Sequence, residues 1–265
     1  MIDPVSPNSL SNTQSALQSS LQRLSSASRI NSAKDDAAGL AIAVQLATQL
    51  LGDQQAARNV ADGLSLTETA SGALNQVSDS LQRIRELSVQ AANGTNSASD
   101  VQAIQAEIGQ LGQEIGRIAG STEFNGQKLL DGSFSAQIQS GPAAGDTQPL
   151  SLGSVTPNDL GIAGLDVSTL AGASTALEAI DTAIGTVNTQ RANIGAAQAG
   201  LNSTLANLNN TYENLAASRS RIADTDFAAE TSSLAQNSVR QQAANKALAV
   251  YNEVQSNSVL SLIKP

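Results

Sequence analysis

The chain has 265 residues, 14 of them basic and 23 acidic, for a net charge of −9. This balance argues against nucleic acid or an anionic membrane surface as the main partner, because both attract clusters of Lys and Arg. The absence of both histidine and cysteine excludes Ser-His-Asp catalysis and thiolate metal sites, and it argues against zinc hydrolysis. The sequence therefore favours a structural or binding role, and we expect neither a cofactor nor an enzymatic activity.

Helical periodicity begins close to the start of the chain. Residues 9–28 carry leucines at helical spacing, and an Ala-rich apolar stretch at residues 40–51 follows a polar break. Residues 66–91 then place apolar side chains in heptad steps, which is the pattern of a helix that keeps one seam against a partner helix. We predict three separate helices in this part of the chain.

A further helix is predicted over residues 101–118, where isoleucine, leucine and valine recur in heptad register. Ser99 or Asp100 is the expected N-cap, because a short polar side chain there can accept a hydrogen bond from a free N–H of the first turn.

The middle of the chain has a different pattern. Phe124-Asn125-Gly126 and Asp131-Gly132 are turn sequences, and residues 134–139 alternate as a strand that residues 147–152 can pair with. Residues 153–174 are rich in Gly, Ser, Thr and Pro, which is consistent either with a linker or with a compact loop crossing.

Residues 177–222 carry an unbroken heptad pattern in which eleven of fourteen seam positions are apolar. A continuous helix of this length would extend about 70 Å at 1.5 Å per residue. Three polar residues interrupt the seam: Arg191, Gln198 and Arg219. They are either exposed irregularities or buried polar groups that fix the register of helices or subunits, and we favour the second interpretation for Arg219.

A last helical segment starts at Asp226 and carries two apolar rows, one through Leu234, Leu248 and Leu262 and one through Val250 and Val254. Together the segments predict a mainly α fold: a long antiparallel helical rod or coiled coil with a small β-hairpin region at the fold-back end. The start of the chain has no signal-peptide pattern, and 18 consecutive apolar residues occur nowhere.

Several long motifs resemble those of bacterial flagellins. Near the N-terminus the chain reads RLSSASRINSAKDDAAGLAI from Arg23, and further on it reads LQRIRELSVQAAN from Leu81 and FNGQKLL from Phe124. The C-terminal part contributes SRSRIADTDFAAE from Ser218. The similarity covers roughly residues 8–152 and 175–263.

The resemblance implies a subunit that self-assembles into the helical flagellar filament for motility. In that family the terminal helices pair as a coiled coil in an inner tube, and the rod forms an outer tube. By this resemblance the chain divides into an inner-tube helix with its spoke (1–44), a first half of the rod with the β-hairpin (45–152), a connector in place of the variable outer domains (153–174), a second rod helix (175–225) and a C-terminal inner-tube helix (226–265).

The family also implies partners and a location. The expected partners are further copies of the chain, the flagellar cap, the hook-junction proteins, an export chaperone and host Toll-like receptor 5, with no nucleic acid and no membrane. The expected location is the extracellular filament, reached by type III export without a cleaved signal peptide.

Two groups of site residues follow by motif. We expect the first group to make subunit contacts: Leu17, Leu21, Leu24, Asp35, Asp36, Arg219, Leu248, Val254, Val259 and Leu262. The second group matches the innate-receptor contacts of the family: Arg83, Leu87 and Glu107. Leu87 also lies on the heptad seam, so a place in the helical core is an equal alternative for it.

Other interpretations compete with these. Asp35-Asp36 and Asp224/Asp226 could be acid/base carboxylate pairs, but caps at helix junctions explain them better. The whole chain could instead be a hook–filament junction protein or a flagellin-like cell-surface binding protein. An enzymatic insertion is excluded by the short connector and by the absence of the histidines that an HExxH motif needs.

Overall fold

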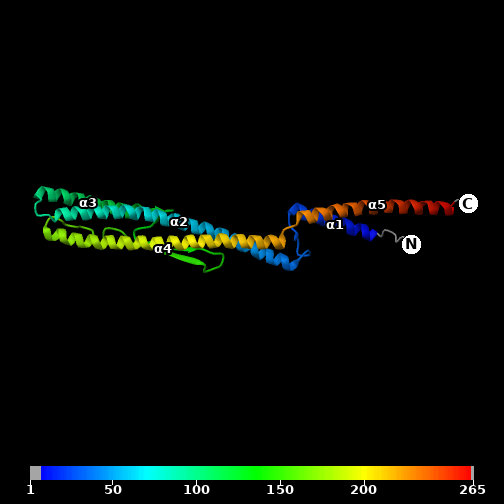
Figure 1. The fold of residues 1–265 in the computed structure, drawn as a ribbon, viewed down its shortest axis with the longest axis horizontal. Helices are drawn as coiled ribbons and strands as arrows, with labels where there is room; N and C mark the ends of the chain where they lie inside the picture. The colour runs from blue at the N-terminus through cyan, green and yellow to red at the C-terminus, as the bar shows by residue number, and fades with distance from the viewer. Residues whose placement is uncertain (1–6, 264–265) are drawn as a thin grey trace. The chain divides into compact units, whose positions relative to one another are not determined.

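The computed structural model describes residues 7–263, and within them the chain forms long helices and two small antiparallel sheets (Figure 1). It divides into two compact units, one of residues 51–212 and the other of the residues up to Leu50 together with those from Glu213 on. The elements are α1 (Pro7–Ser26), α2 (Ala37–Ala91), α3 (Ala98–Ser121), β1 (Glu123–Phe124), β2 (Gln127–Lys128), β3 (Ser135–Gln139), β4 (Thr147–Ser151), α4 (Leu170–Ala223) and α5 (Phe227–Ile263). The mainly α prediction is confirmed.

Helix α2 is continuous over 55 residues, whereas the sequence predicted two separate helices with a break between residues 51 and 66. Glycines in this stretch face the β3–β4 hairpin. A Cβ on Gly52 would lie 2.7 Å from Cβ of Pro142, and one on Gly63 would lie 2.5 Å from Cδ1 of Ile138. The glycines therefore allow close packing of the hairpin, which compensates for their low helix propensity.

Helix α3 begins with a capping box, whose N-cap lies two residues before the first of the two predicted positions. Ser97 is the N-cap and its side chain accepts from the backbone N–H of Asp100, while the Asp100 carboxylate accepts from the Ser97 N–H. The prediction of Ser99 or Asp100 as the N-cap is thus wrong, although Asp100 belongs to the cap as its third helical residue.

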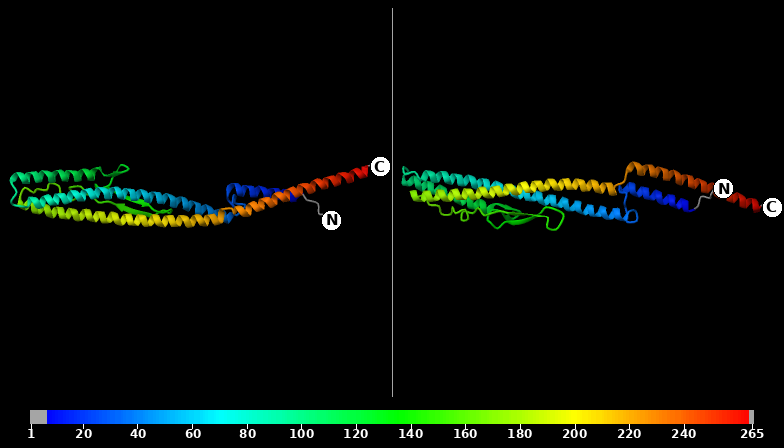
Figure 2. Two further views of the ribbon diagram at one scale, coloured as in Figure 1. Left: turned by 45° about the horizontal axis from the view of Figure 1, so that its top comes forward. Right: turned by 60° about the horizontal axis from the view of Figure 1, so that its bottom comes forward.

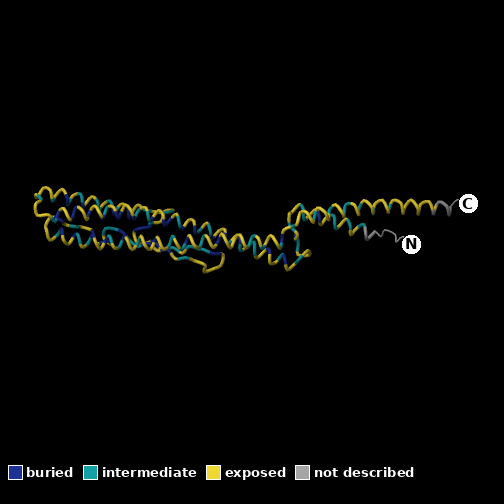
Figure 3. Tube along the Cα trace, in the orientation of Figure 1, coloured by how far each residue is buried: buried dark blue, intermediate teal, exposed yellow. Residues whose placement is uncertain are grey.

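The core of the unit 51–212 lies between α2, α3 and α4, as the heptad patterns predicted (Figure 3). Arg85 on α2 pairs with Asp181 on α4, and Gly63 lies against Leu201, so these two helices run antiparallel. The largest fully buried side chains of the three helices are aliphatic: Val60, Leu74, Val77, Leu81, Ile84, Leu87, Ile115, Ile180 and Leu201.

The two hairpins follow α3. Strands β1 and β2 are joined by Asn125 and Gly126, whose φ angles of 49° and 77° suit an Asn-Gly turn. Strands β3 and β4 pair in antiparallel register from Ser135↔Ser151 to Gln139↔Thr147.

The β3–β4 hairpin lies beside the middle of α2 and α4, not at the fold-back end as predicted. The side-chain Nδ2 of Asn59 on α2 donates to the carbonyl of Gln139 at 3.1 Å. On the other side, Gln148 lies against Gly200 of α4. The reason is that α3 carries the chain back along α2 for 24 residues before the strands begin.

The connector is a compact crossing and not an open linker. Its side chains Val155, Leu160, Ile162 and Val167 are buried. Gln105 of α3 holds it at two points: its Nε2 donates to the Leu165 carbonyl and its Oε1 accepts from the Val167 N–H, both at 2.7 Å.

The polar interruptions of the α4 seam are mostly exposed. Arg191 and Arg219 lie at the surface and Gln198 is half-buried. The interpretation of Arg219 as a buried register group is therefore wrong within this chain, and its role in subunit contacts stays a prediction. In the described residues no helix is long and apolar enough to cross a membrane.

Candidate assembly surface

Helices α1 and α5 pack against each other as an antiparallel pair (Figures 1 and 2). Arg23 near the end of α1 forms an ion pair with Glu230 near the start of α5, at 3.7 Å. Leu17 and Leu24 of α1 and Leu234 and Leu248 of α5 are half-buried. Their heptad spacing agrees with a seam between the two helices.

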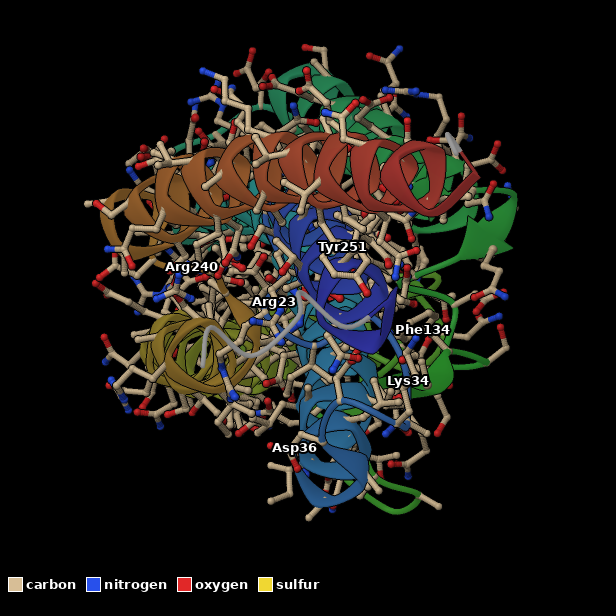
Figure 4. All side chains as sticks on the ribbon, turned by 90° about the vertical axis from the view of Figure 1, so that its right-hand side faces the viewer. Arg23, Lys34, Asp36, Phe134, Arg240 and Tyr251 are labelled. Carbon is tan, nitrogen blue, oxygen red and sulfur yellow. The ribbon has the colours of Figure 1, made fainter. Side chains whose placement is uncertain are left out.

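Helix α5 has 37 residues and α1 has 20, so α5 continues well past its partner. Counting along the antiparallel pair from Arg23 and Glu230, the start of α1 lies beside about residue 246. Figure 3 shows α5 exposed over almost its whole described length, and Figure 4 shows Arg240 and Tyr251 projecting from it. The large exposed apolar side chains of this helix are Phe227, Val239, Val250, Tyr251, Val254 and Val259.

The predicted assembly residues of the terminal helices thus fall into two groups. Leu17, Leu24 and Leu248 are half-buried. Leu21, Val254 and Val259 are 50%, 61% and 52% exposed and remain available to another molecule. The side chain of Leu262 lies outside the described residues.

Asp35 and Asp36 shape the turn before α2. Oδ2 of Asp35 accepts from the backbone N–H groups of Asn31 and Ser32, and from the Ser32 hydroxyl at 2.8 Å. The Ser32 hydroxyl is the main cause that lowers the pKa of the Asp35 carboxyl. Asp36 is the N-cap of α2, since its Oδ1 accepts from the Gly39 N–H at 2.7 Å.

The other carboxylate pair has a similar role. Oδ1 of Asp226 accepts from the N–H groups of Ala228 and Ala229 at the start of α5. The capping interpretation is therefore confirmed for Asp36 and Asp226. Asp36 also lies 4.0 Å from the guanidinium of Arg29 within the same chain.

A strand-like bridge joins the segments that precede α2 and α5. The Arg29 N–H donates to the Ala223 carbonyl at 2.7 Å, and the Thr225 N–H donates to the Ala27 carbonyl at 3.1 Å. Ser28 adds a hydroxyl bond to the same Ala223 carbonyl. This bridge could not be predicted from the sequence, because its partners lie almost 200 residues apart and no local periodicity encodes it.

A second surface contains the residues matched to receptor contacts. Arg83 on α2 lies between two carboxylates, with Glu107 of α3 at 2.9 Å and Glu86 at 3.2 Å. The hydrogen bond to Glu107 is the main cause that raises the pKa of the guanidinium. Arg83 and Glu107 are about half exposed, whereas Leu87 is only 2% exposed and belongs to the core.

The described residues contain no group of three or more carboxylates that could hold a metal ion.

Comparison with known proteins gives a consistent result over most of the chain. The bacterial flagellin N-terminal helical region matches residues 5–135, and the bacterial flagellin C-terminal helical region matches residues 177–263. The chain is 48% identical over 161 residues to the phase 1 flagellin of Salmonella naestved and to the flagellin of Salmonella dublin. These matches cover 61% of this chain and 32% of each Salmonella protein, so the chain spans about a third of the length of these relatives.

Solved structures agree with this result. The chain is similar to Bacillus cereus flagellin, with 38% identity, a TM-score of 0.53 and coverage of 57% of this chain and 88% of the other. Its fold is also similar to that of a putative flagellar hook-associated protein from Vibrio parahaemolyticus, with 17% identity, a TM-score of 0.61 and coverage of 72% and 100%.

Proposed function

Because this chain belongs to the bacterial flagellin family, we propose that it is a structural subunit that polymerises into the flagellar filament and serves motility. The observation that carries the proposal is the apolar surface of α5 beyond the start of α1, where Val250, Val254 and Val259 are each more than half exposed. A helix that leaves such side chains in water has an apolar face that other copies of the chain can cover.

Burying one large aliphatic side chain contributes about 1.5–3 kcal/mol, and every subunit of a polymer repeats the contribution. An interface between different faces of identical subunits propagates into an open helical filament when its rotation does not close. The exposed face of α5 therefore supports polymerisation better than a role as an isolated monomer.

The test removes residues 248–265. The shortened chain should no longer polymerise, while the helices of the unit 51–212 remain folded by circular dichroism. Electron microscopy and sedimentation measure the polymer, and filaments of normal length from the shortened chain would contradict the proposal.

A point substitution separates apolar contact from charge. Val254→Asp should strongly reduce polymer yield, whereas Asn252→Asp adds the same charge at an exposed polar position of the same helix and should reduce it little. Equal losses for both variants would attribute the effect to charge and not to the apolar face.

The proposal includes a location and partners. The subunit would act outside the cell after export without a cleaved signal peptide, and its partners would be further copies of itself, the flagellar cap, the hook-junction proteins and an export chaperone. Its role is structural and not catalytic. Electron microscopy of material shed from cells would separate a filament subunit from a hook–filament junction protein or a cell-surface binding protein.

Contact with Toll-like receptor 5 is the second part of the proposal. It is supported by the exposure of Arg83 and Glu107 on neighbouring helices. The burial of Leu87 speaks against a direct contact by this residue in the structure described. Arg83→Ala should reduce receptor-reporter signalling by the monomer without loss of helix content, and equal potency of variant and wild type would remove this part of the proposal.

A further inference from the structure

We propose that the outer edge of β3 binds an extended peptide segment of a partner protein by strand addition. The segment would carry apolar side chains at alternate positions and one basic residue.

The pattern shows which backbone groups face outward. Two bonds extend the hairpin ladder: the Leu152 N–H donates to the Phe134 carbonyl, and the Ser140 N–H donates to the Asp146 carbonyl. The β3-side residues of these two bonds, Phe134 and Ser140, flank the strand and have even numbers, so the even-numbered residues of β3 are the ones bonded to β4. Because paired and unpaired positions alternate in an antiparallel ladder, the N–H and C=O groups of Ser135 and Gln137 point away from β4.

These groups have no backbone partner in the described part of the chain outside the sheet. The next outward carbonyl, that of Gln139, already accepts a hydrogen bond from Nδ2 of Asn59 at 3.1 Å. An amide side chain thus occupies one position of this edge in the way that a strand would. The remaining positions form a template for an added strand.

The two edges of the hairpin differ. The outward positions of β4 include Pro149, which pairs opposite Gln137 and has no N–H to donate. Proline on an edge is a common protection against unwanted strand pairing. Of the two hairpin edges, β3 is therefore the one without a proline.

A groove of about 320 Å³ lies between this edge and α2. Its apolar lining comes from Leu66, Phe124, Ile138 and Leu150, and alternate side chains of an added strand could contact these residues. Asp62 also lines the groove, is exposed, and forms no ion pair within the described residues. It favours a Lys or Arg in the bound segment.

The groove favours a single strand over a second copy of this chain. Its far wall is helix α2, so an incoming β3–β4 hairpin with its own supporting helices would meet α2 before its edge could pair. A free peptide segment needs to span only the five residues of β3, about 17 Å at strand rise.

The test measures fluorescence anisotropy of a labelled seven-residue peptide of alternating valine and threonine with one lysine, added to dilute full-length monomer. We expect saturable binding. Gln137→Pro should weaken it about tenfold or more, because proline removes the central donor of the edge. Ser151→Pro makes the same change on the opposite edge and should leave binding unchanged.

Two further measurements do not depend on whether the proline variants fold. A peptide that is N-methylated at alternate residues should bind about tenfold more weakly, and Asp62→Asn should weaken binding of the lysine peptide but not of a version with glutamine in place of lysine. Three results of the binding experiments would overturn the proposal: no saturable binding, equal binding of the N-methylated peptide, or equal effects of the two proline variants. The proposal would also be wrong if the protein dimerised with rising concentration and Gln137→Pro abolished the dimer, because the edge would then bind a second copy of the chain.

Discussion

Asp53 is a buried carboxylate on the face of α2 near the hairpin tip. It is 2% exposed, and its Oδ2 has no hydrogen-bond partner in the described residues. Burial raises the pKa of its carboxyl, and the charge of Asp146 on the hairpin raises it further. A folded-state pKa above the unfolded value means that the protonated carboxyl favours folding. The contribution of the protonated Asp53 carboxyl to stability is complete at a pH below its pKa in the unfolded chain. It is lost as the pH rises through its pKa in the folded protein.

Asp53→Asn should therefore stabilise the protein at neutral pH, by about 1 kcal/mol, since it removes a buried charge without a partner. The difference from wild type should shrink toward zero as the pH falls below about 3.9, the ordinary pKa of an aspartate. Thermal unfolding, followed by circular dichroism at several pH values, measures this difference in stability between variant and wild type. Asp62→Asn, at an exposed position nearby, is the control, and a stability gain that does not vary with pH would contradict the argument.

The sequence predicted the burial of some of these side chains and not of others. The heptad pattern placed Leu87 on the helical seam, in agreement with its burial. The burial of Asp53 could not be predicted, because it arises from a hairpin almost 90 residues further along the chain. The pairing of Arg83 with Glu107 likewise depends on how α2 and α3 meet.

At the scale of single elements, the start of α3 depends on one reciprocal cap. The Ser97 hydroxyl is the main cause that lowers the pKa of the Asp100 carboxyl, and the Ser97 backbone N–H adds to it. A lowered folded-state pKa means that the ionised carboxylate favours folding. This contribution is present above the unfolded pKa and is lost as pH falls through the folded one.

Ser97→Ala should lower the free energy of unfolding by about 1 kcal/mol, the usual effect of removing an N-cap side chain. Ser99→Ala, at one of the two positions that the sequence predicted for the cap, should have a smaller effect because the Ser99 hydroxyl is hydrogen-bonded to the hydroxyl of Ser97. Urea unfolding of both variants measures the difference. Equal destabilisation would mean that the cap is shared between the two serines.

Helix boundaries show where local patterns stop being sufficient. The sequence predicted the long heptad segments of α2 and α4, because each seam faces another helix throughout. It did not predict that residues 52–65 continue α2, since Gly52 and Gly63 lower helix propensity. Their role becomes clear only when Pro142 and Ile138 of the hairpin occupy the space that a Cβ would fill.

Buried apolar side chains are distributed unevenly between the two units of the chain. Most of them lie within residues 51–212, while the described residues of the other unit contribute only Ile30, Ala43, Leu50 and Ala223. Terminal helices with so little buried surface are marginal by themselves. We predict that they are ordered fully only in the polymer.

Limited proteolysis checks this prediction. Protease should trim the monomer at both ends to a core of roughly residues 45–225, whereas the same digestion of polymer should leave the ends intact. Mass spectrometry of the products identifies the boundaries. Resistance of both ends in the monomer would show that folding of the terminal helices does not depend on assembly.

The connector between β4 and α4 is the place where the chain should accept an added domain. Gly164 is exposed, has a φ of 70°, and has no atom within 4 Å of the position of a Cβ. The residues on either side are anchored, since Ile162 is buried and Gln105 holds the Leu165 carbonyl. An insertion between Ala163 and Gly164 would therefore leave the anchors in place.

A small domain inserted there should change the midpoint of thermal unfolding by less than about 2 °C, which corresponds to less than about 1 kcal/mol for a chain of this size. It should also leave polymerisation intact. The matched control places the same domain between Val155 and Thr156, where Val155 is fully buried and its N–H donates to the Leu130 carbonyl at 2.9 Å. This second insertion must separate a buried side chain from the core, so it should lower the unfolding midpoint markedly. If both insertions have the same effect, local anchoring does not decide where the chain tolerates a domain.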